Sequence, residues 1–585
     1  MKMHADISLR SVLQKTVYLV SLSLLCLHSG FSQDSLQHIK ESLYLQTDRD
    51  LYVVGEQVWM KVNKLNAHSN KPDNISKVVY IELLNQAGYP VNQLKLHVPD
   101  KSGFASFTLS DTLSSGNYLL RSYTSWMKNF PAQDFSFRTI SVINPFRNIE
   151  KIGVQKSALV DEGEDTSQMV RTDNGLLFEL NFDRSSYGTR ERVQVSIQAR
   201  DSSGNPVEAD LSLSIARSIL FNDQRANFHD PVHPSGKEEP ALPSPYLPEL
   251  EGVILSGTLL NSITDEPIGN EDIVLSIVGK TARCQFYRTN DTGEFYFNLD
   301  NSGVQELVIQ PLDSALGDYY VELEPDFLNV YDHPLSGPLY LDTTKLQALN
   351  QGIINMQIEN EYKPYRHPKL VSTPEPLEYD FYGDAEYHIQ ISDYIPLKTI
   401  REVIKEIVPM VSVRVKDGLN SLVVENGVDN VNFDKAPLVL VDGVPFGDVD
   451  QILNISLSEL ESIEVINLKY FLDGHVFEGI VHFVTVEGKM AGLEVDHAVF
   501  RQAYTAISKE SCFSSPVYNS DSLKSSPLPD FRNTLYWNPD LHTREDGLTS
   551  LEFYTSDETG YYTVFVEGIS TEGKSGYIYK KLLVH

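Results

Sequence analysis

Alternating apolar and polar residues, interrupted by short turns, run through most of the chain. Between residues 40 and 147 lie the strand-like runs ESLYLQT, QVWMKV, VVYIELL and FASFTL, and glycine, asparagine or aspartate residues lie between them. Short strands that recur roughly every 8–12 residues with turns of this kind are typical of β-sandwiches. We therefore expect a mainly β protein with several sandwich domains, of which residues 40–147 form the first.

The same pattern recurs in later blocks. Residues 175–235 contain the runs VQVSIQA and ADLSLSIA on either side of a turn at Gly204, and residues 251–325 contain GVILSGTLL and EFYFNL. We expect a second and a third β domain there. The tail, residues 531–585, has four strand-like runs, which is fewer than the roughly seven strands of a full sandwich. We expect it either to complete the second block or to form a small sheet.

One segment, residues 396–490, combines a helical period with buried strands. An apolar stripe at helical spacing consists of Ile400, Val403, Ile404 and Ile407. The strand-like runs VSVRV, LVVEN, PLVLV, IEVINL and GIVHFVTV follow. Because PLVLV is apolar at successive positions, we expect Val439, Leu440 and Val441 to be buried in a strand covered on both faces. This segment predicts a small αβ domain.

The remaining segments are expected to connect these domains. They are an acidic linker at 148–174, a proline-rich linker at 236–250, an irregular or helical connector at 326–395 and a further connector at 491–530. His229 and His233 have the spacing at which two histidines on a helix share a metal ion. Pro231 lies between them and argues against that helix, so we interpret them as linker residues.

The N-terminal residues 1–32 have the order of features of an export signal. A basic start precedes the run TVYLVSLSLLCL, which is too short to span a bilayer, and Gly30-Phe31-Ser32 follows. We expect cleavage after Ser32. Acylation at Cys26 is the less favoured alternative, because Leu25 is larger than the residue such a site requires. No later stretch reaches about 18 apolar residues, so we expect no transmembrane segment in the mature chain.

The net charge and the absence of known catalytic motifs argue against several classes of function. Lys and Arg number 48 against 80 Asp and Glu, a net charge of −32, which opposes binding to nucleic-acid phosphates. Cys284 and Cys512 fall in different predicted domains, so no disulfide framework is expected. The sequence contains no H-E-x-x-H, C-x-x-C, P-loop or G-x-S-x-G motif. We therefore predict no catalytic residue, cofactor or metal, and an enzyme with an unrecognised site is the less favoured alternative.

Several motifs resemble known domain families. The first set resembles the motifs of a macroglobulin-type (MG2) domain of the alpha-2-macroglobulin family. It consists of Thr47-Asp48-Arg49, Tyr52, Gly55-Glu56, Val58-Trp59 and Gly116-Asn117-Tyr118. Residues 175–235 and 531–585 are similar to further macroglobulin-type strands. The second set resembles a carboxypeptidase-regulatory-like sandwich and consists of Gly257, Asp265–Ile268 and Asp291–Phe295. The third set resembles the plug domain of TonB-dependent receptors and consists of Pro437–Val439, Asp442–Pro445, Leu460–Val465 and Gly479–Val481.

The resemblance has limits that bear on function. The reactive thioester of large macroglobulins needs a spaced Cys and Gln, whereas Cys284 and Gln285 are adjacent, so a protease trap of that type is not expected. The segment after Gly488 is too short for a membrane barrel of the chain's own. The combination resembles a family of exported Bacteroidota proteins that carry these domains without a barrel.

This resemblance implies a non-catalytic binding or scaffold protein in the periplasm or at the outer membrane. Its plug-like domain would dock on an outer-membrane protein or complex. An accessory ligand-binding role in TonB-dependent nutrient uptake is the alternative. The segment KYFLDGHVFEG replaces the glycine-rich run usual in plug domains, and four large apolar residues in it are candidate partner contacts: Tyr470, Phe471, Leu472 and Phe477. Alternatively, all four pack under the module's own sheet.

Overall fold

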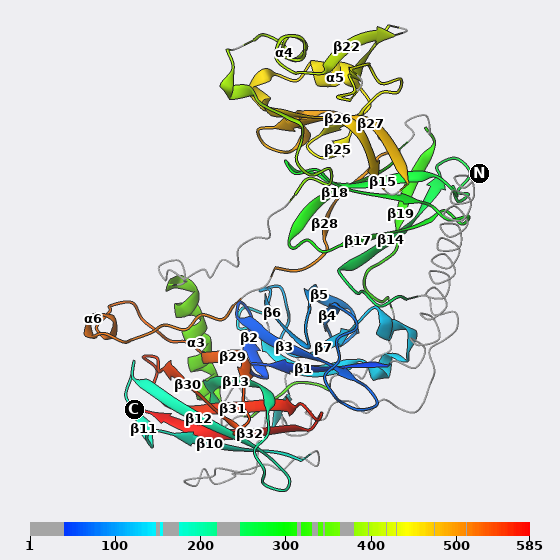
Figure 1. Ribbon diagram of the computed structural model, residues 1–585. Coiled ribbons are helices and arrows are strands. Elements are labelled where there is room, and N and C mark those ends of the chain that lie inside the picture. Colours follow the sequence, from blue (N-terminus) through cyan, green and yellow to red (C-terminus); the bar gives the residue numbers. More distant parts are fainter. Residues whose placement is uncertain are drawn as a thin grey trace, which may run out of the picture. The chain divides into compact units, whose positions relative to one another are not determined.

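The computed structural model describes residues 40–147, 153–155, 175–218, 246–312, 317–329, 337–342, 346–362, 379–395, 397–416, 418–428, 430–472, 474–509 and 512–585 (Figure 1). The expected signal peptide, His229 and His233 lie outside these residues. The described chain is mainly β and forms two compact units. Unit 1 comprises Met1–Leu250, Asn329–Lys369 and Glu510–His585, and unit 2 comprises Glu251–Leu328 and Leu370–Lys509. In the described part, none of the helices has the length and apolarity needed to cross a membrane.

The first sandwich of unit 1 has two sheets. One has the order β1 (Glu41–Thr47), β3 (Gln57–Asn66), β6 (Ser102–Thr108), and the other has the order β2 (Leu51–Val53), β8 (Ser136–Ile143), β7 (Gly116–Tyr123), β4 (Val78–Leu84), β5 (Pro90–His97). Aromatic rings fill its core, where Tyr123 stacks on Tyr80 at 5.5 Å and on Phe135 at 4.9 Å between ring centroids. Burial of such large rings is a main source of sandwich stability.

The second sandwich of unit 1 joins distant parts of the chain. Its sheets have the orders β10 (Leu176–Phe182), β12 (Arg192–Asp201), β30 (Leu548–Tyr554) and β11 (Ser186–Tyr187), β32 (Ser575–Val584), β31 (Gly560–Ser570), β13 (Ala209–Arg217), β29 (Thr534–His542). In β12 the residues Val193, Val195, Ile197 and Ala199 are buried and those between them face outward. Of the two arrangements expected for the tail, the strand pairing corresponds to completion of the second block.

Two short strands and two helices also belong to unit 1. The short parallel pair β9 (Gly153–Gln155) and β20 (Tyr340–Asp342) comes from segments far apart in the sequence. Helix α3 (Leu346–Tyr362) lies in the segment where the sequence predicts a helical connector. Helix α6 (Asp521–Lys524) is a single turn in the loop that precedes β29, and Ser520 caps it by accepting a hydrogen bond from the Leu523 N–H.

Unit 2 begins with a third sandwich. Its sheets have the orders β17 (Glu294–Leu299), β14 (Val253–Asn261), β19 (Tyr319–Leu323) and β16 (Arg283–Arg288), β15 (Asp272–Ile277), β18 (Val304–Pro311), β28 (Phe500–Thr505). Strand β28 comes from the segment 491–530, which the sequence predicts to be only a connector. Its side chains are exposed or only partly buried, so it lacks the buried alternation by which the other strands are found in the sequence.

The αβ module follows in unit 2. Its sheet has the order β21 (Tyr387–Gln390), β26 (Leu460–Leu472), β27 (His475–Thr485), β24 (Leu438–Val441), β25 (Val444–Pro445), with a separate hairpin of β22 (Val411–Lys416) and β23 (Leu419–Val424). Helices α4 (Ile400–Glu406) and α5 (Val449–Leu453) complete it. Strand β21 lies before residue 396, so the module begins earlier than the sequence predicts.

Burial in the αβ module follows the predicted pattern. Ile400, Val403 and Ile404 on α4 are buried in its core, as the helical stripe predicts. Thr399 begins this helix by accepting a hydrogen bond from the Glu402 N–H at 3.2 Å. The prediction that Val439, Leu440 and Val441 are buried is also confirmed. Strand β24 is therefore a central strand covered on both faces.

Candidate functional site

The candidate contact residues lie on a two-stranded ribbon at the end of β26 and β27. The register pairs Tyr470 with Phe477 and Phe471 with Val476. The neighbouring strands β21 and β24 pair only with residues 462–465 and 480–483, so this end of the hairpin projects beyond the sheet. Because successive side chains on a strand point to opposite faces, Tyr470 and Phe477 share one face, and Phe471 and Val476 share the other.

The inner face of the ribbon packs inside unit 2. Phe477 is only 9% exposed, and its ring centroid lies 5.3 Å from that of Phe286 in the third sandwich. The Tyr470 hydroxyl donates a hydrogen bond of 2.6 Å to the carbonyl of Phe381. Leu472 is partly buried in the same cluster. Three of the four candidates thus pack between the module's own sheet, where Ile466 and Ile480 belong to the same cluster, and the third sandwich.

The outer face of the ribbon is exposed. Phe471 is 70% exposed and Val476, opposite it, is 48% exposed. Leu468 is exposed as well, and the loop that carries Val428 lies beside it, since the Gly427 N–H donates to the Asn467 carbonyl at 3.0 Å. We call Phe471 and Val476 the outer ribbon face. An apolar surface of this kind, fixed from behind by buried aromatic rings, is suited to contact another protein.

A chain of hydrogen bonds behind the ribbon is a feature that the sequence reasoning missed. The backbone N–H of Gly443 donates to His482 Nε2 at 3.0 Å. His482 Nδ1 lies 2.7 Å from the Tyr382 hydroxyl, which donates to Glu464 Oε2 at 2.7 Å. The other oxygen of Glu464 lies 2.9 Å from Nδ1 of the exposed His388. The chain therefore runs from the buried turn at Gly443 to the surface of the module.

The direction of this chain follows from its first donor. A backbone N–H can only donate, so His482 Nε2 must carry a lone pair, and the proton of the neutral ring is on Nδ1. This proton points at Tyr382, whose own proton goes to Glu464. Burial lowers the pKa of His482 from 6.5 to about 4, although Glu464 acts in the opposite direction. Burial also raises the pKa of Tyr382, so the phenol keeps its proton.

Among the residues that the structure describes, two groups of side chains have the composition of metal sites. Asp380, Glu464 and His482 hold ligand atoms within 4.8 Å of one another, as do Asp210, Asp540 and His542. In the first group, the protonated Nδ1 of His482 has no lone pair to offer. In the second, the Lys61 ammonium lies 2.6 Å from an Asp210 oxygen and repels a cation. We assign no metal to either group.

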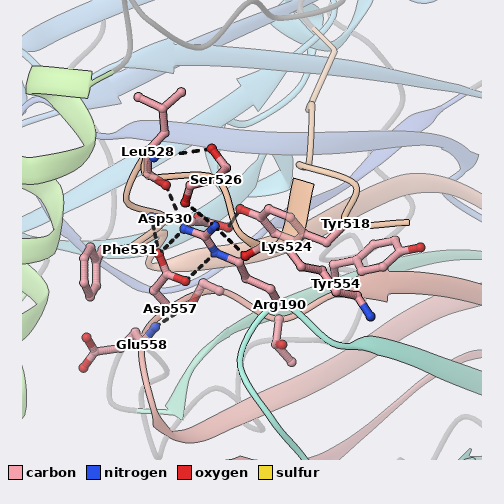
Figure 2. Close-up of polar contacts among 12 residues, drawn as sticks. Arg190, Tyr518, Lys524, Ser526, Leu528, Asp530, Phe531, Tyr554, Asp557 and Glu558 are labelled. Atoms are coloured by element: carbon pink, nitrogen blue, oxygen red, sulfur yellow. Dashed lines mark hydrogen bonds and ion pairs between the residues drawn. The ribbon is translucent and has the colours of Figure 1, made fainter. Parts of the chain in front are cut away.

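An arginine clamp holds the loop through which the chain returns to the second sandwich. Figure 2 shows the Arg190 guanidinium, which donates to both carboxylate oxygens of Asp557 at 2.6 Å each. It also donates to the carbonyls of Lys524, Ser526 and Leu528 at 3.0, 2.7 and 2.7 Å. All five N–H donors of the guanidinium therefore have acceptors. Such complete pairing indicates a structural role.

The macroglobulin-like motif of the first sandwich also has a structural role. Asp48 and Arg49 form an ion pair of 3.3 Å and are both buried. The Thr534 hydroxyl of the second sandwich donates to Asp48 at 2.9 Å, and the Asn533 amide donates to Glu56 at 2.6 Å. The motif thus links the two sandwiches of unit 1 through buried polar contacts.

The thiol of Cys284 is placed where it cannot react easily. It is buried beside the αβ module and donates a hydrogen bond of 3.1 Å to the carbonyl of Gly443. Burial raises its pKa from 9.0 to about 12, so the nucleophilic thiolate is scarce at neutral pH. Cys284 is therefore suited to packing.

Comparisons with known proteins describe only a distant resemblance. No family model matches the chain, and no curated protein matches it. Among solved structures, trypsin-activated alpha-2-macroglobulin from Escherichia coli is 10% identical, with 94% of this chain and 42% of that chain covered and a TM-score of 0.24. Salmonella alpha-2-macroglobulin reacted with methylamine is 10% identical, with 93% and 39% covered and a TM-score of 0.22. The D0-D1 domain of intimin is 9% identical, with 48% and 98% covered and a TM-score of 0.14.

The chain spans less than half the length of the macroglobulin structures that it matches. At these TM-scores the comparisons have no bearing on function.

Proposed function

We propose that this chain is a non-catalytic binding protein of the bacterial envelope, which docks on an outer-membrane protein through its αβ module. The outer ribbon face is the contact surface, and the sandwiches present it. Its location is the periplasm or the outer membrane. The expected signal peptide and the plug-like motifs of the module support this location.

The observation that carries the proposal is the exposed pair of Phe471 and Val476. Exposing a phenylalanine to water is unfavourable, and contact with a partner would remove that apolar area from water. Phe477 and Tyr470 anchor the other face of the same ribbon, so the surface is held in place before a partner arrives. A rigid apolar surface loses little conformational entropy on binding, which favours affinity.

Site-specific photo-crosslinking tests the proposal. A photoreactive amino acid at position 471 should form a crosslink to an outer-membrane protein in intact cells of the source bacterium, because this position faces outward. The same amino acid at position 477 should crosslink only within the chain, because that position faces the third sandwich. The crosslinked partner is identified by mass spectrometry. A crosslinking pattern that is the same at both positions would contradict the assignment of the outer ribbon face.

A paired variant gives the second test. Phe471→Ser with Val476→Ser should abolish copurification of the crosslinked partner and leave the melting temperature unchanged. The matched control is Val415→Ser with Leu419→Ser on the β22–β23 hairpin of the same module, where the two side chains are 69% and 68% exposed. This control removes similar apolar area and should retain the partner. Retention by the first variant, or equal loss from both, would exclude docking through this face.

A further inference from the structure

The third sandwich and the αβ module meet at a joint, and two of its polar contacts adjoin His482. The first is a strap, residues 379–386, that precedes β21. Phe381 donates its N–H to the carbonyl of Ala282 at 2.8 Å, and the Asp380 carboxylate accepts from the Ala282 N–H at 2.6 Å. On the module side, Phe381 accepts the hydrogen bond from Tyr470. The strap therefore holds residues of both domains at once.

The second contact is the turn at Asp442 and Gly443. Gly443 has a φ of 75°, and a Cβ there would lie 3.1 Å from the Cα of Ala282. The Cys284 thiol of the sandwich donates to the Gly443 carbonyl. The turn thus approaches the sandwich so closely that only glycine fits without displacement. His482 binds both contacts, since it accepts from Gly443 and lies against Tyr382 of the strap.

A second proton on His482 is incompatible with this arrangement. The only free ring position is Nε2, which faces the N–H of Gly443 at 3.0 Å. Two donors would then point at each other in a fully buried place, and one of them must lose its partner. The ring or the turn has to move, and the hydrogen bond to Tyr382 would be disturbed with it.

The charges around His482 do not remove this conflict. Glu464 on β26 attracts a proton to the ring, but it already accepts from Tyr382 and pairs with His388. The buried Asp442 carboxylate accepts from Thr485 and Met490. The titratable groups beside the ring are Asp380 and Tyr382 on the strap and Glu464 on β26. Asp442 and Cys284 belong to the adjoining turn contact.

We propose that His482 is a proton-operated latch, which keeps the joint between the third sandwich and the αβ module closed when neutral and opens it when protonated. Opening would free the strap and the inner ribbon face, including Tyr470 and Phe477. This inference goes beyond the docking function and stands whether or not the outer ribbon face binds a partner.

The size of the effect follows from proton linkage. If His482 titrates at about 4 in the closed state and at its ordinary 6.5 in the open state, acid favours opening in the window between these values. Above about pH 6.5 the closed state has its full advantage, which is lost as the pH falls toward 4. At about pH 5 the opening equilibrium should be larger by roughly thirtyfold than at about pH 8.

Amide hydrogen exchange on the full-length protein measures this opening. After correction for intrinsic rates, protection of peptides from the strap and from the turn at 442–446 should fall roughly thirtyfold between about pH 8 and about pH 5. Peptides from β31 and β32 in unit 1 are the internal reference and should keep their protection. No change in the strap and turn, or an equal fall in the reference peptides, would overturn the proposal.

Two variants separate the latch from other acid effects. His482→Gln can still accept from Gly443 and donate to Tyr382 but does not titrate, so its strap should remain protected at about pH 5. The control is His388→Gln, which lies at the exposed end of the hydrogen-bond chain. In this variant the joint should open in acid as it does in the wild type. An acid opening in His482→Gln equal to that of the wild type would refute the role of this residue.

Exchange at the imidazole C2 carbon gives a readout that needs no variant. Measured by mass spectrometry on the wild-type protein, it reports the titration of each histidine separately. His482 should exchange slowly and titrate well below 6.5, whereas a midpoint at or above 6.5 would show that the closed joint tolerates the protonated ring. This measurement keeps the proposal falsifiable even where His482→Gln does not fold.

Discussion

Arg190 and Asp557, which are 367 residues apart in the sequence, form a two-pronged ion pair with both contacts at 2.6 Å. Arg190 lies just before β12, and Asp557 lies between β30 and β31. The pair thus joins the early and late halves of the second sandwich. The backbone N–H of Asp530 also donates to Asp557 at 2.9 Å, so the incoming loop shares the same carboxylate (Figure 2).

We expect Arg190→Ala to destabilise unit 1 by about 3 kcal/mol, because it leaves a partly buried carboxylate and three carbonyls without their donor. The control is Arg192→Ala, two residues on, whose ion pair with Glu552 is more than half exposed on both sides and should be worth well under about 1 kcal/mol. Urea denaturation gives both values. Equal losses in the two variants would show that the clamp contributes no more than a surface ion pair.

A second prediction concerns the contact between the two sandwiches of unit 1. Asp48→Ala removes a carboxylate acceptor of Tyr52 and Thr534 and leaves Glu56 as the carboxylate paired with Arg49. We expect a loss of about 3–5 kcal/mol and separate unfolding transitions for the two sandwiches. Asp111→Ala at an exposed position is the control. Scanning calorimetry distinguishes the outcomes, and one unchanged transition in Asp48→Ala would contradict the linking role.

The two faces of the ribbon should differ in their effect on stability. Phe477→Ala creates a cavity against Phe286 and is expected to cost about 3–5 kcal/mol. Phe471→Ala, on the exposed face, should change the free energy of unfolding by less than about 0.5 kcal/mol. Chemical denaturation followed by far-ultraviolet circular dichroism measures both. A large loss in Phe471→Ala would mean that this ring is packed and is not available to a partner.

Lys64 makes the free energy of unfolding depend on pH in the alkaline range. Its ammonium donates to Asn74, to the Ser76 carbonyl at 2.7 Å and to the Val98 carbonyl at 2.6 Å, and burial lowers its pKa from 10.5 to about 8. The unfolded chain therefore binds more protons between these two pH values, and stability rises with pH across that window.

Lys64→Met removes this contribution. We expect the free energy of unfolding of the wild type to rise by roughly 2 kcal/mol relative to this variant between about pH 8 and about pH 10.5. Lys101→Met at an exposed position should follow the wild-type profile. Parallel pH profiles for the wild type and Lys64→Met would show that the side chain titrates normally in the folded protein.

Local pattern predicted the strands better than their partners. The alternation in β12 identifies Val193 and Val195 as inward-facing from the sequence alone, because a period of two needs only neighbouring residues. That β12 pairs with β30 depends on contacts between residues more than 350 positions apart, such as Arg192 and Glu552. No local pattern contains this information, so the sequence left two arrangements of the tail open.

The candidate site shows the same division. Alternation places Tyr470 and Phe471 on opposite faces of a strand but cannot say which face meets the third sandwich. The polar chain was missed because Tyr382 lies 100 residues from His482, with no motif to connect them. One signal was present, since His482 interrupts the apolar run GIVHFVTV, and a polar residue inside a buried strand requires a partner.

The completion of the second sandwich by the tail affects how the protein is made. The Ala209 N–H, at the start of β13, donates a hydrogen bond to the hydroxyl of Thr543, a residue that is synthesised 334 positions later. At about 5–20 residues per second, the ribosome needs tens of seconds to reach it. Until then, β10, β12 and β13 have exposed backbone edges on which other chains can add as strands. A chaperone that covers these edges until the tail is available would therefore oppose aggregation of the incomplete chain.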